Sequence, residues 1–222
     1  MSIIEFLKDL FFPRRAECMG CGSRVGSEYD DLCADCRERL SKGWIGVRMP
    51  DVNMKIANAA YAYRYASPAG GMVRKLKYSG VWVLADEMAR DIARAAELLH
   101  VKDAFVTYVP MHIFRERRRG FNHGEMLARK AAERLNMECA GLLRRTRNAP
   151  QQARLSREER INNLKGAFVV PEDKKDRVNG RNILLIDDVF TTGATAKSCA
   201  EALLDAGAAK VYFVGYAYGE RS

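Results

Sequence analysis

The sequence lacks the long apolar runs of a membrane protein and the opening segment of a secreted one. No run approaches the about 18 apolar residues that a spanning helix needs, and the opening M-S-I-I-E-F-L-K-D-L-F-F-P is acidic and too short for a signal peptide. Internal repeats, low-complexity tracts and coiled-coil heptads are also absent. A chain of 222 residues can still bury a full core. We therefore expect a cytoplasmic protein with one α/β domain and a small appendage, without membrane insertion.

Histidine is scarce, whereas arginine is abundant and clustered. Of three histidines, neither His112 nor His123 is assigned a catalytic role, because a lone loop histidine is more often a hydrogen-bonding surface group. Lysine and arginine outnumber acidic residues by 37 to 28, which gives a net charge of +9. Charge runs are usually solvated faces, but on the loops of a phosphate-binding domain they favour pyrophosphate or nucleic acid. The clusters are Arg115, Arg117, Arg118 and Arg119, our nucleic-acid candidates; Arg144, Arg145 and Arg147; and Arg154, Arg157 and Arg160.

Four of the six cysteines have the spacing of a metal site. They form C-x2-C-x11-C-x2-C, which places two thiolate pairs on two knuckles and suits tetrahedral zinc. Two disulfides are the alternative, which a cytosolic setting disfavours. With all four positions filled, one Zn²⁺ would be structural and would supply most of the folding free energy of the module, on the order of 10 kcal/mol. The four ligands would be Cys18, Cys21, Cys33 and Cys36.

The clearest chemical signal is the stretch 183–195, I-L-L-I-D-D-V-F-T-T-G-A-T. Four apolar residues predict a strand buried on both faces, which should stop at Asp187 and Asp188, at the sheet edge where α/β proteins bind ligands. The next residues lead into an amphipathic helix whose first amides, with hydroxyls and a glycine, would cradle a phosphate. The carboxylates would then receive sugar hydroxyls. An ordinary strand, turn and helix with a solvated acidic pair is the alternative. The loop comprises Thr191, Thr192, Gly193, Ala194 and Thr195.

This stretch resembles the 5-phosphoribosyl-1-pyrophosphate (PRPP) signature of type I phosphoribosyltransferases and matches every position of it. In that fold the first βα connection holds pyrophosphate, and the segment L-K-Y-S-G is similar in place and type, so Lys75, Lys77 and Tyr78 are pyrophosphate candidates. The polar segment 148–160 resembles the lid that closes over PRPP, and it adds Arg147 and Arg154. A surface turn and a plain solvent-facing loop are the alternatives.

A base-binding hood, as transferases of this type have, would have to come from residues before 67, because little chain follows the last expected strand. The stretch 56–65 predicts a strand with Tyr61, Tyr63 and Tyr65 on one face, where they would stack a base or pack in the core. We therefore divide the chain into a zinc-finger module with a short N-terminal helix at 1–45, a connecting or hood-like segment at 46–66 and a phosphoribosyltransferase domain at 67–222.

The order of motifs resembles the ComF family of competence-associated proteins, which join a zinc finger to a phosphoribosyltransferase domain. The similarity rests on the four cysteines, K-L-K-Y-S-G, V-P-M-H-I-F-R-E-R-R-R-G-F-N, R-T-R-N-A-P-Q-Q-A-R-L-S-R-E-E-R-I-N-N-L-K-G-A-F and the PRPP signature, and it covers almost the whole chain. It implies a role in taking up single-stranded DNA for natural transformation, often beside a helicase-like translocase.

If the protein is an enzyme, the resemblance implies displacement of pyrophosphate at the ribose anomeric carbon. Mg²⁺ would neutralise the leaving group, while Asp187 and Asp188 would orient the ribose diol. Whether any transfer occurs stays open. The alternatives are an orthodox phosphoribosyltransferase of nucleotide metabolism with an unidentified nitrogenous acceptor, and a non-enzymatic DNA-binding or docking protein on the same fold.

Overall fold

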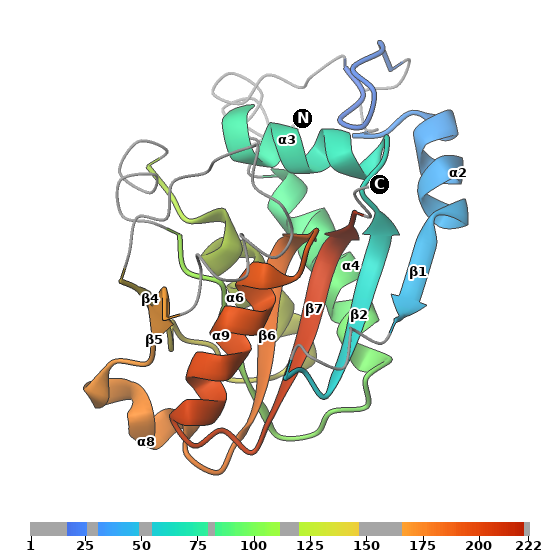
Figure 1. Cartoon of the computed structure of the whole chain (residues 1–222). Helices are drawn as coiled ribbons and strands as arrows, with labels where there is room; N and C mark the ends of the chain where they lie inside the picture. The colour runs from blue at the N-terminus through green and yellow to red at the C-terminus, as the bar shows by residue number, and fades with distance from the viewer. Residues whose placement is uncertain are drawn as a thin grey trace, which may run out of the picture.

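The computed structural model describes residues 17–25, 31–48, 55–79, 83–111, 120–146 and 166–219. These residues form a five-stranded sheet with helices on both faces and a short two-stranded sheet beside it (Figure 1). The strands are β1 (Trp44–Val47), β2 (Asn58–Arg64), β3 (Ala104–Tyr108), β4 (Arg144–Arg145), β5 (Phe168–Val169), β6 (Asn182–Phe190) and β7 (Lys210–Tyr218). The helices are α2 (Ala34–Lys42), α3 (Ala69–Ser79), α4 (Val83–Glu97), α6 (His123–Leu135), the 3-10 turn η2 (Glu172–Lys174), α8 (Lys175–Val178) and α9 (Ala194–Asp205).

The main sheet has the strand order β1-β2-β7-β6-β3. Strands β2, β7, β6 and β3 run parallel, and β1 is an antiparallel edge strand. The expected fold class, a mainly parallel α/β sheet flanked by helices, is confirmed. The sequence places β2 in a connecting segment, but this strand pairs with β7 from Asn58 to Arg64 and so belongs to the main sheet. The domain limits 1–45, 46–66 and 67–222 stay predictions.

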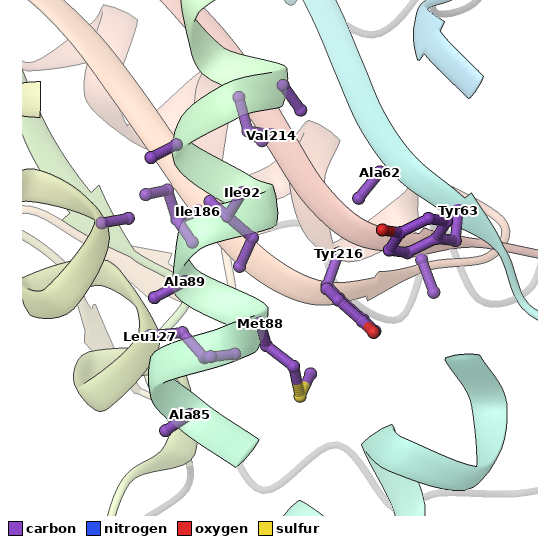
Figure 2. Packing of buried hydrophobic residues seen from close by; sticks show 14 of the residues in the cluster. Ala62, Tyr63, Ala85, Met88, Ala89, Ile92, Leu127, Ile186, Val214 and Tyr216 are labelled. Atoms are coloured by element: carbon purple, nitrogen blue, oxygen red, sulfur yellow. The ribbon is translucent and has the colours of Figure 1, made fainter. Parts of the chain in front are cut away.

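The core lies in two layers, one on each face of the sheet. Helices α4 and α6 cover one face and α9 covers the other. Helix α4 forms because buried apolar residues recur every fourth position, at Leu84, Met88 and Ile92. Figure 2 shows Met88 and Ile92 among the side chains between this helix and the strands, near Ile186 of β6. Each such side chain contributes about 1.5–3 kcal/mol through burial.

The strand β2 does not carry its tyrosines on one face. Tyr61 packs against Phe190 and Phe213 on the α9 side, with ring centroids 5.2 and 5.9 Å away. Tyr63 belongs to the α4 side, where its hydroxyl donates to Asp91 Oδ2 at 3.1 Å. The expected common face is wrong, because Ala62 and Tyr63 both pack on the α4 side and the alternation of the strand breaks there. Both rings are core residues, and the tyrosines of this stretch do not form a common platform for a base.

Within the described residues, no helix has both the length and the apolar character to cross a membrane.

Candidate functional site

The carboxyl ends of β3 and β6 lie at a switch point of the sheet. The chain leaves β3 towards α6 on one face, and it leaves the neighbouring β6 towards α9 on the opposite face (Figure 1). Open α/β sheets bind ligands where the connections of adjacent strands diverge in this way. The acidic pair lies near this end of β6, and α3 lies across the carboxyl ends of the strands. The topology therefore brings three helices to the predicted site.

The sequence predicts that the strand stops at the two acidic residues, but the strand continues beyond them. Strand β6 continues to Phe190, because β7 supplies a partner as far as Tyr218. Consecutive strand residues point to opposite faces, so Asp188 faces the α6 side, whereas Asp187 lies on the α9 side with Cys199 in its electrostatic reach. The Asp188 amide donates to Asp187 Oδ1 at 2.8 Å. The pair is adjacent in sequence but serves two sides of the sheet.

Asp188 is the centre of a buried charge cluster. Lys77 Nζ lies 2.9 Å from Oδ1 and 2.8 Å from Oδ2, and His123 Nε2 lies 2.6 Å from Oδ2. The Asp188 side chain is only 5% exposed, and that of Lys77 is 22% exposed. Oδ2 is fully buried and lies within contact distance of both nitrogens. A ligand that contacts this oxygen would therefore have to displace part of these contacts.

The surroundings shift the pKa values of the two carboxyl groups in opposite directions. Burial opposes the charge of Asp188, but Lys77 and His123 outweigh it and hold the pKa of Asp188 well below its usual range. Burial and the charge of Asp188 raise the pKa of Asp187, which Lys77 and the Asp188 amide offset only in part. Burial also opposes the charge of Lys77, yet Asp188 and Asp187 raise its pKa. At neutral pH the site holds one firmly ionised carboxylate and one that readily carries a proton.

The loop after β6 forms the start of α9. Gly193 is the N-cap with φ of +74°, a left-handed conformation that costs a residue with a side chain about 1–2 kcal/mol. The Thr192 hydroxyl accepts a hydrogen bond from the Ala194 amide at 3.4 Å. The first amides of a helix have no acceptor within the helix. Residues 191–195 thus place backbone donors beside the carboxyl end of β6, where an anion would lie.

The structure separates the remaining candidates of the first βα connection. Lys77 reaches Asp188, whereas the Lys75 ammonium donates to the Cys18 carbonyl at 2.7 Å. Tyr78 is 68% exposed. Arg144 and Arg145 form β4, where the Arg145 guanidinium lies over the Phe168 ring at 5.5 Å. The following candidates lie outside the described residues: Arg147, Arg154, Arg157, Arg160, Arg115, Arg117, Arg118 and Arg119.

His123 is the residue that the sequence did not reveal. It is the first residue of α6 and is 9% exposed, so it is not the surface loop histidine that its isolation suggested. The preceding Asn122 accepts a hydrogen bond from the Glu125 amide at 3.2 Å and fixes the helix start. A detectable signal was present: His123 follows a capping residue in the connection after β3, where α/β proteins place ligand-binding groups.

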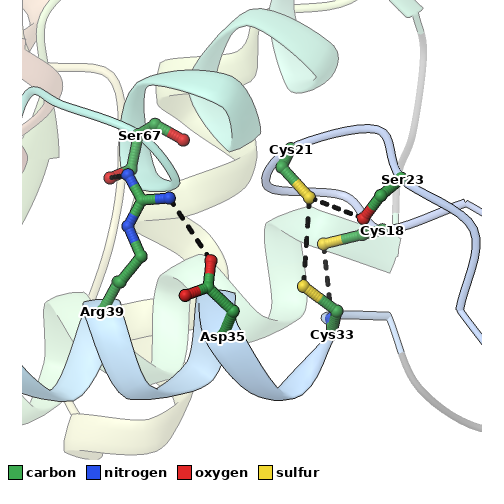
Figure 3. Close-up of polar contacts among 7 residues, drawn as sticks. All are labelled: Cys18, Cys21, Ser23, Cys33, Asp35, Arg39 and Ser67. Carbon is green, nitrogen blue, oxygen red and sulfur yellow. Dashed lines mark hydrogen bonds and ion pairs between the residues drawn. The ribbon is translucent and has the colours of Figure 1, made fainter.

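The four paired cysteines form one cluster, as expected. Their sulfur atoms all lie within 4.8 Å of one another, and Figure 3 shows the thiols of Cys18, Cys21 and Cys33 converging. The Sγ atoms of Cys21 and Cys33 are 3.9 Å apart, close to the about 3.8 Å edge of a tetrahedron with zinc–sulfur bonds of about 2.3 Å. All four thiols are free, so the arrangement favours a metal site over two disulfides. The cluster can hold one zinc ion.

The Cys18 thiol already has the environment of a metal ligand. Its sulfur accepts a hydrogen bond from the Cys33 amide at 3.3 Å. Burial opposes the thiolate, but the backbone amides around it lower the pKa of Cys18 to about 6. Amide donors to sulfur favour the thiolate, the form that binds zinc.

The cysteine cluster packs directly on α3. A Cβ atom on Gly71 would lie 2.1 Å from the Gly20 carbonyl oxygen, so the two backbones touch where only glycine fits. The Arg39 guanidinium of α2 donates to the carbonyl of Ser67, just before α3, at 3.1 Å (Figure 3). Helix α3 therefore contacts the cluster near its start and sends Lys77 to Asp188.

Comparison with known proteins identifies the family. No family model matches the chain. The chain is 34% identical over 154 residues to the DNA utilization protein YhgH of Escherichia coli, a match that covers 66% of each protein. It is 23% identical over 221 residues to Competence protein F of Haemophilus influenzae, and this match covers 90% of the chain and 96% of that protein. The chain belongs to the ComF family. This ComF chain matches just under two thirds of the length of the Escherichia coli relative.

One solved structure superposes on part of the chain. A glutamine PRPP amidotransferase of Bacillus subtilis, complexed with ADP and GMP, superposes with a TM-score of 0.40 and 18% identity, over 59% of this ComF chain and 25% of the amidotransferase. The fold class is defined by the sheet order and by the PRPP signature, which spans most of β6 and the start of α9.

Proposed function

We propose that this ComF protein binds PRPP at the carboxyl ends of β3 and β6 and acts on single-stranded DNA during natural transformation. The observation that carries the proposal is Asp188, a buried carboxylate kept ionised by Lys77 and His123 beside the start of α9. A ribose diol offers hydroxyl donors to such a carboxylate, and Asp188 would accept one as Lys77 turns away from it.

The rest of PRPP matches the charges around Asp188. The amides and hydroxyls of 191–195 would hold the 5-phosphate. Lys77 would exchange part of its contact with Asp188 for the pyrophosphate, a stronger anion partner. Asp187, whose pKa is raised, would face the ribose from the α9 side of β6 and donate or accept a proton there. Arg147 and Arg154 would add positive charge from the segment that we expect to close over the ligand.

Two metals belong to the proposal. The cysteine cluster would hold Zn²⁺ as a structural ion. Mg²⁺ would neutralise the pyrophosphate, and most of its ligands would be oxygens of PRPP and water, since Lys77 and His123 already contact Asp188.

Calorimetric titration with PRPP and Mg²⁺ tests the binding step. We expect saturable binding that requires Mg²⁺ and is lost in the double variant Asp187→Asn, Asp188→Asn. Asp86→Asn, an exposed carboxylate on α4, is the matched control and should bind normally. Binding that the double variant retains would refute the assignment. Release of pyrophosphate from PRPP with bases, nucleotides or DNA would then show whether transfer occurs.

The proposed role in DNA handling rests on the names of the relatives and on the basic clusters. Competence protein F and the DNA utilization protein YhgH are named for competence and for DNA use. Arg117, Arg118 and Arg119 would contact phosphates of a single strand, alone or beside a helicase-like translocase. Each phosphate neutralised makes affinity fall by about 0.7 log units per log unit of salt.

Salt-dependent binding of a single-stranded oligonucleotide tests this role. The triple variant Arg117→Gln, Arg118→Gln, Arg119→Gln should reduce the slope by about 2. Arg129→Gln, on the surface of α6, is the control and should leave the slope unchanged. An unchanged slope in the triple variant would contradict the assignment of these arginines, whatever the result with PRPP.

A further inference from the structure

A cavity lies at the opposite edge of the sheet, where β1 and β2 run, between α2 of the cysteine module and α4 of the main domain. Its volume is about 410 Å³, within the usual range of small-molecule sites. Helix α2 lines one side of it with Arg37, and α4 lines the opposite side with Asp91 and Arg94. The edge of the sheet supplies Trp44 and Tyr63. The candidate PRPP residues do not line it, so its ligand would be separate.

Asp91 gives this cavity a hydrogen-bond acceptor. The carboxyl group is partly buried, and the Tyr63 hydroxyl donates to its Oδ2. Burial disfavours the charged form of Asp91 and raises its pKa to about 6. The carboxylate is still the main form at neutral pH. A carboxylate has about four acceptor positions, and the Tyr63 hydrogen bond occupies one of them. A ligand with N–H donors can use the others.

Cations and a flat surface surround this acceptor. The Arg94 guanidinium lies over the Trp44 ring at 4.5 Å from its centroid. Arg90 is paired with Glu87 at 3.0 Å, and both line the cavity. Arg37 donates from Nε to the Leu32 carbonyl at 3.1 Å, which fixes its side chain at the rim. The walls therefore offer three guanidinium groups and two carboxylates.

This mixture selects against simple ligands. A polyphosphate or an acidic peptide would place negative groups against Asp91 and Glu87, and a polyamine would face three arginines. A nucleotide satisfies both kinds of wall, because its phosphate is anionic while its base carries N–H donors on a flat ring. Guanidinium and indole groups stack on bases with about 1–3 kcal/mol per base, and carboxylates accept from the amino groups of bases.

We infer that the cavity between α2 and α4 binds one nucleotide, with its phosphate at Arg37 and the amino edge of its base at Asp91. The inference rests on the proposed DNA role only in preferring a nucleotide within a single strand to a free one. It does not depend on PRPP binding. Because the cavity joins the cysteine module to the main domain, its ligand would hold the two together.

Tryptophan fluorescence tests the inference directly. Trp44 and Trp82 are the two tryptophans, so the background variant Trp82→Phe leaves Trp44 as the reporter. We expect dAMP, dCMP and dGMP to change its emission at lower concentration than dTMP, which has no exocyclic amino group. A response of Trp44 to none of the four at millimolar concentration would overturn the inference, as would preferential binding of a glutamate peptide.

Two variants with different signatures locate the groups. Asp91→Ala should weaken the binding of dCMP at least tenfold and abolish the preference over dTMP. Arg37→Gln should weaken all four nucleotides to a similar extent, because it removes a phosphate contact. Arg129→Gln is the matched control and should change neither. Equal losses in Arg37→Gln and Arg129→Gln would contradict the phosphate assignment, after thermal melting has shown that all variants are folded.

Two further experiments test whether the nucleotide is free or part of a single strand, and whether its binding is independent of PRPP. A dodecamer of dC that binds more tightly than dCMP would identify a single strand as the ligand, whereas equal affinity would identify the free nucleotide. Asp188→Asn should keep nucleotide binding while PRPP binding is lost. If the Trp44 response disappears with Asp188→Asn, the cavity is not a separate site and the inference is wrong.

Discussion

Replacing Lys77 by methionine removes one cation from the buried charge cluster and keeps the length of the side chain. Removing one partner of a buried ion pair typically costs about 3–5 kcal/mol, because a charge is left without compensation. Here His123 Nε2 remains 2.6 Å from Asp188, and Lys77 is 22% exposed rather than fully buried. We therefore expect Lys77→Met to lower the free energy of unfolding by about 2–3 kcal/mol.

Urea denaturation at pH 7.5 measures this loss, and a double-mutant cycle assigns it. Asp188→Asn in the Lys77→Met background should cost less than in the wild type, with a coupling energy of at least about 1 kcal/mol. Lys130→Met removes an exposed lysine paired with Asp86 and should cost less than about 0.5 kcal/mol. A loss in Lys77→Met as small as in Lys130→Met, or strictly additive effects in the cycle, would refute the charge cluster.

Three further predictions concern the phosphate loop, Asp91 and zinc. Gly193→Ala and Gly180→Ala place a side chain at φ of +74° and +70°, so each should lose about 1–2 kcal/mol of stability in urea, but only Gly193→Ala should weaken PRPP binding. The folded pKa of Asp91 is raised from 3.8 to about 6, so its contribution to stability is complete below pH 4 and is lost as pH rises through 6. Asp91→Asn should therefore raise the free energy of unfolding at pH 7.5 by up to about 3 kcal/mol and have little effect at pH 3.5. Cys36→Ser should lose bound zinc and melt at lower temperature, whereas Cys139→Ser, outside the cluster, should keep one zinc by elemental analysis.

The features that the sequence predicted correctly depend mostly on residues that are close together in the chain. The apolar run into Asp187 and the turn at Gly193 describe one strand, one loop and one helix that are contiguous in the chain, so their geometry follows from neighbouring residues. The cysteine spacing likewise defines its own cluster, because only two residues separate the cysteines of each pair and the helix α2 begins directly after Cys33.

Long-range contacts were the part that the sequence could not supply. Lys77 and Asp188 are 111 residues apart, and only the placement of α3 across the strand ends brings them together. His123 looked isolated because its partner lies on another strand. The sequence also could not predict which face of β2 each tyrosine occupies, because the hydrogen bond from Tyr63 to Asp91 of α4 is a long-range contact.

The crystal structure of the protein with PRPP and Mg²⁺ tests the central claim most directly. We predict that the ribose diol contacts Asp188, that the 5-phosphate lies against the amides that follow Gly193, and that Lys77 turns towards the pyrophosphate. PRPP bound elsewhere, or density at this site with no contact to Asp187 or Asp188, would contradict the account.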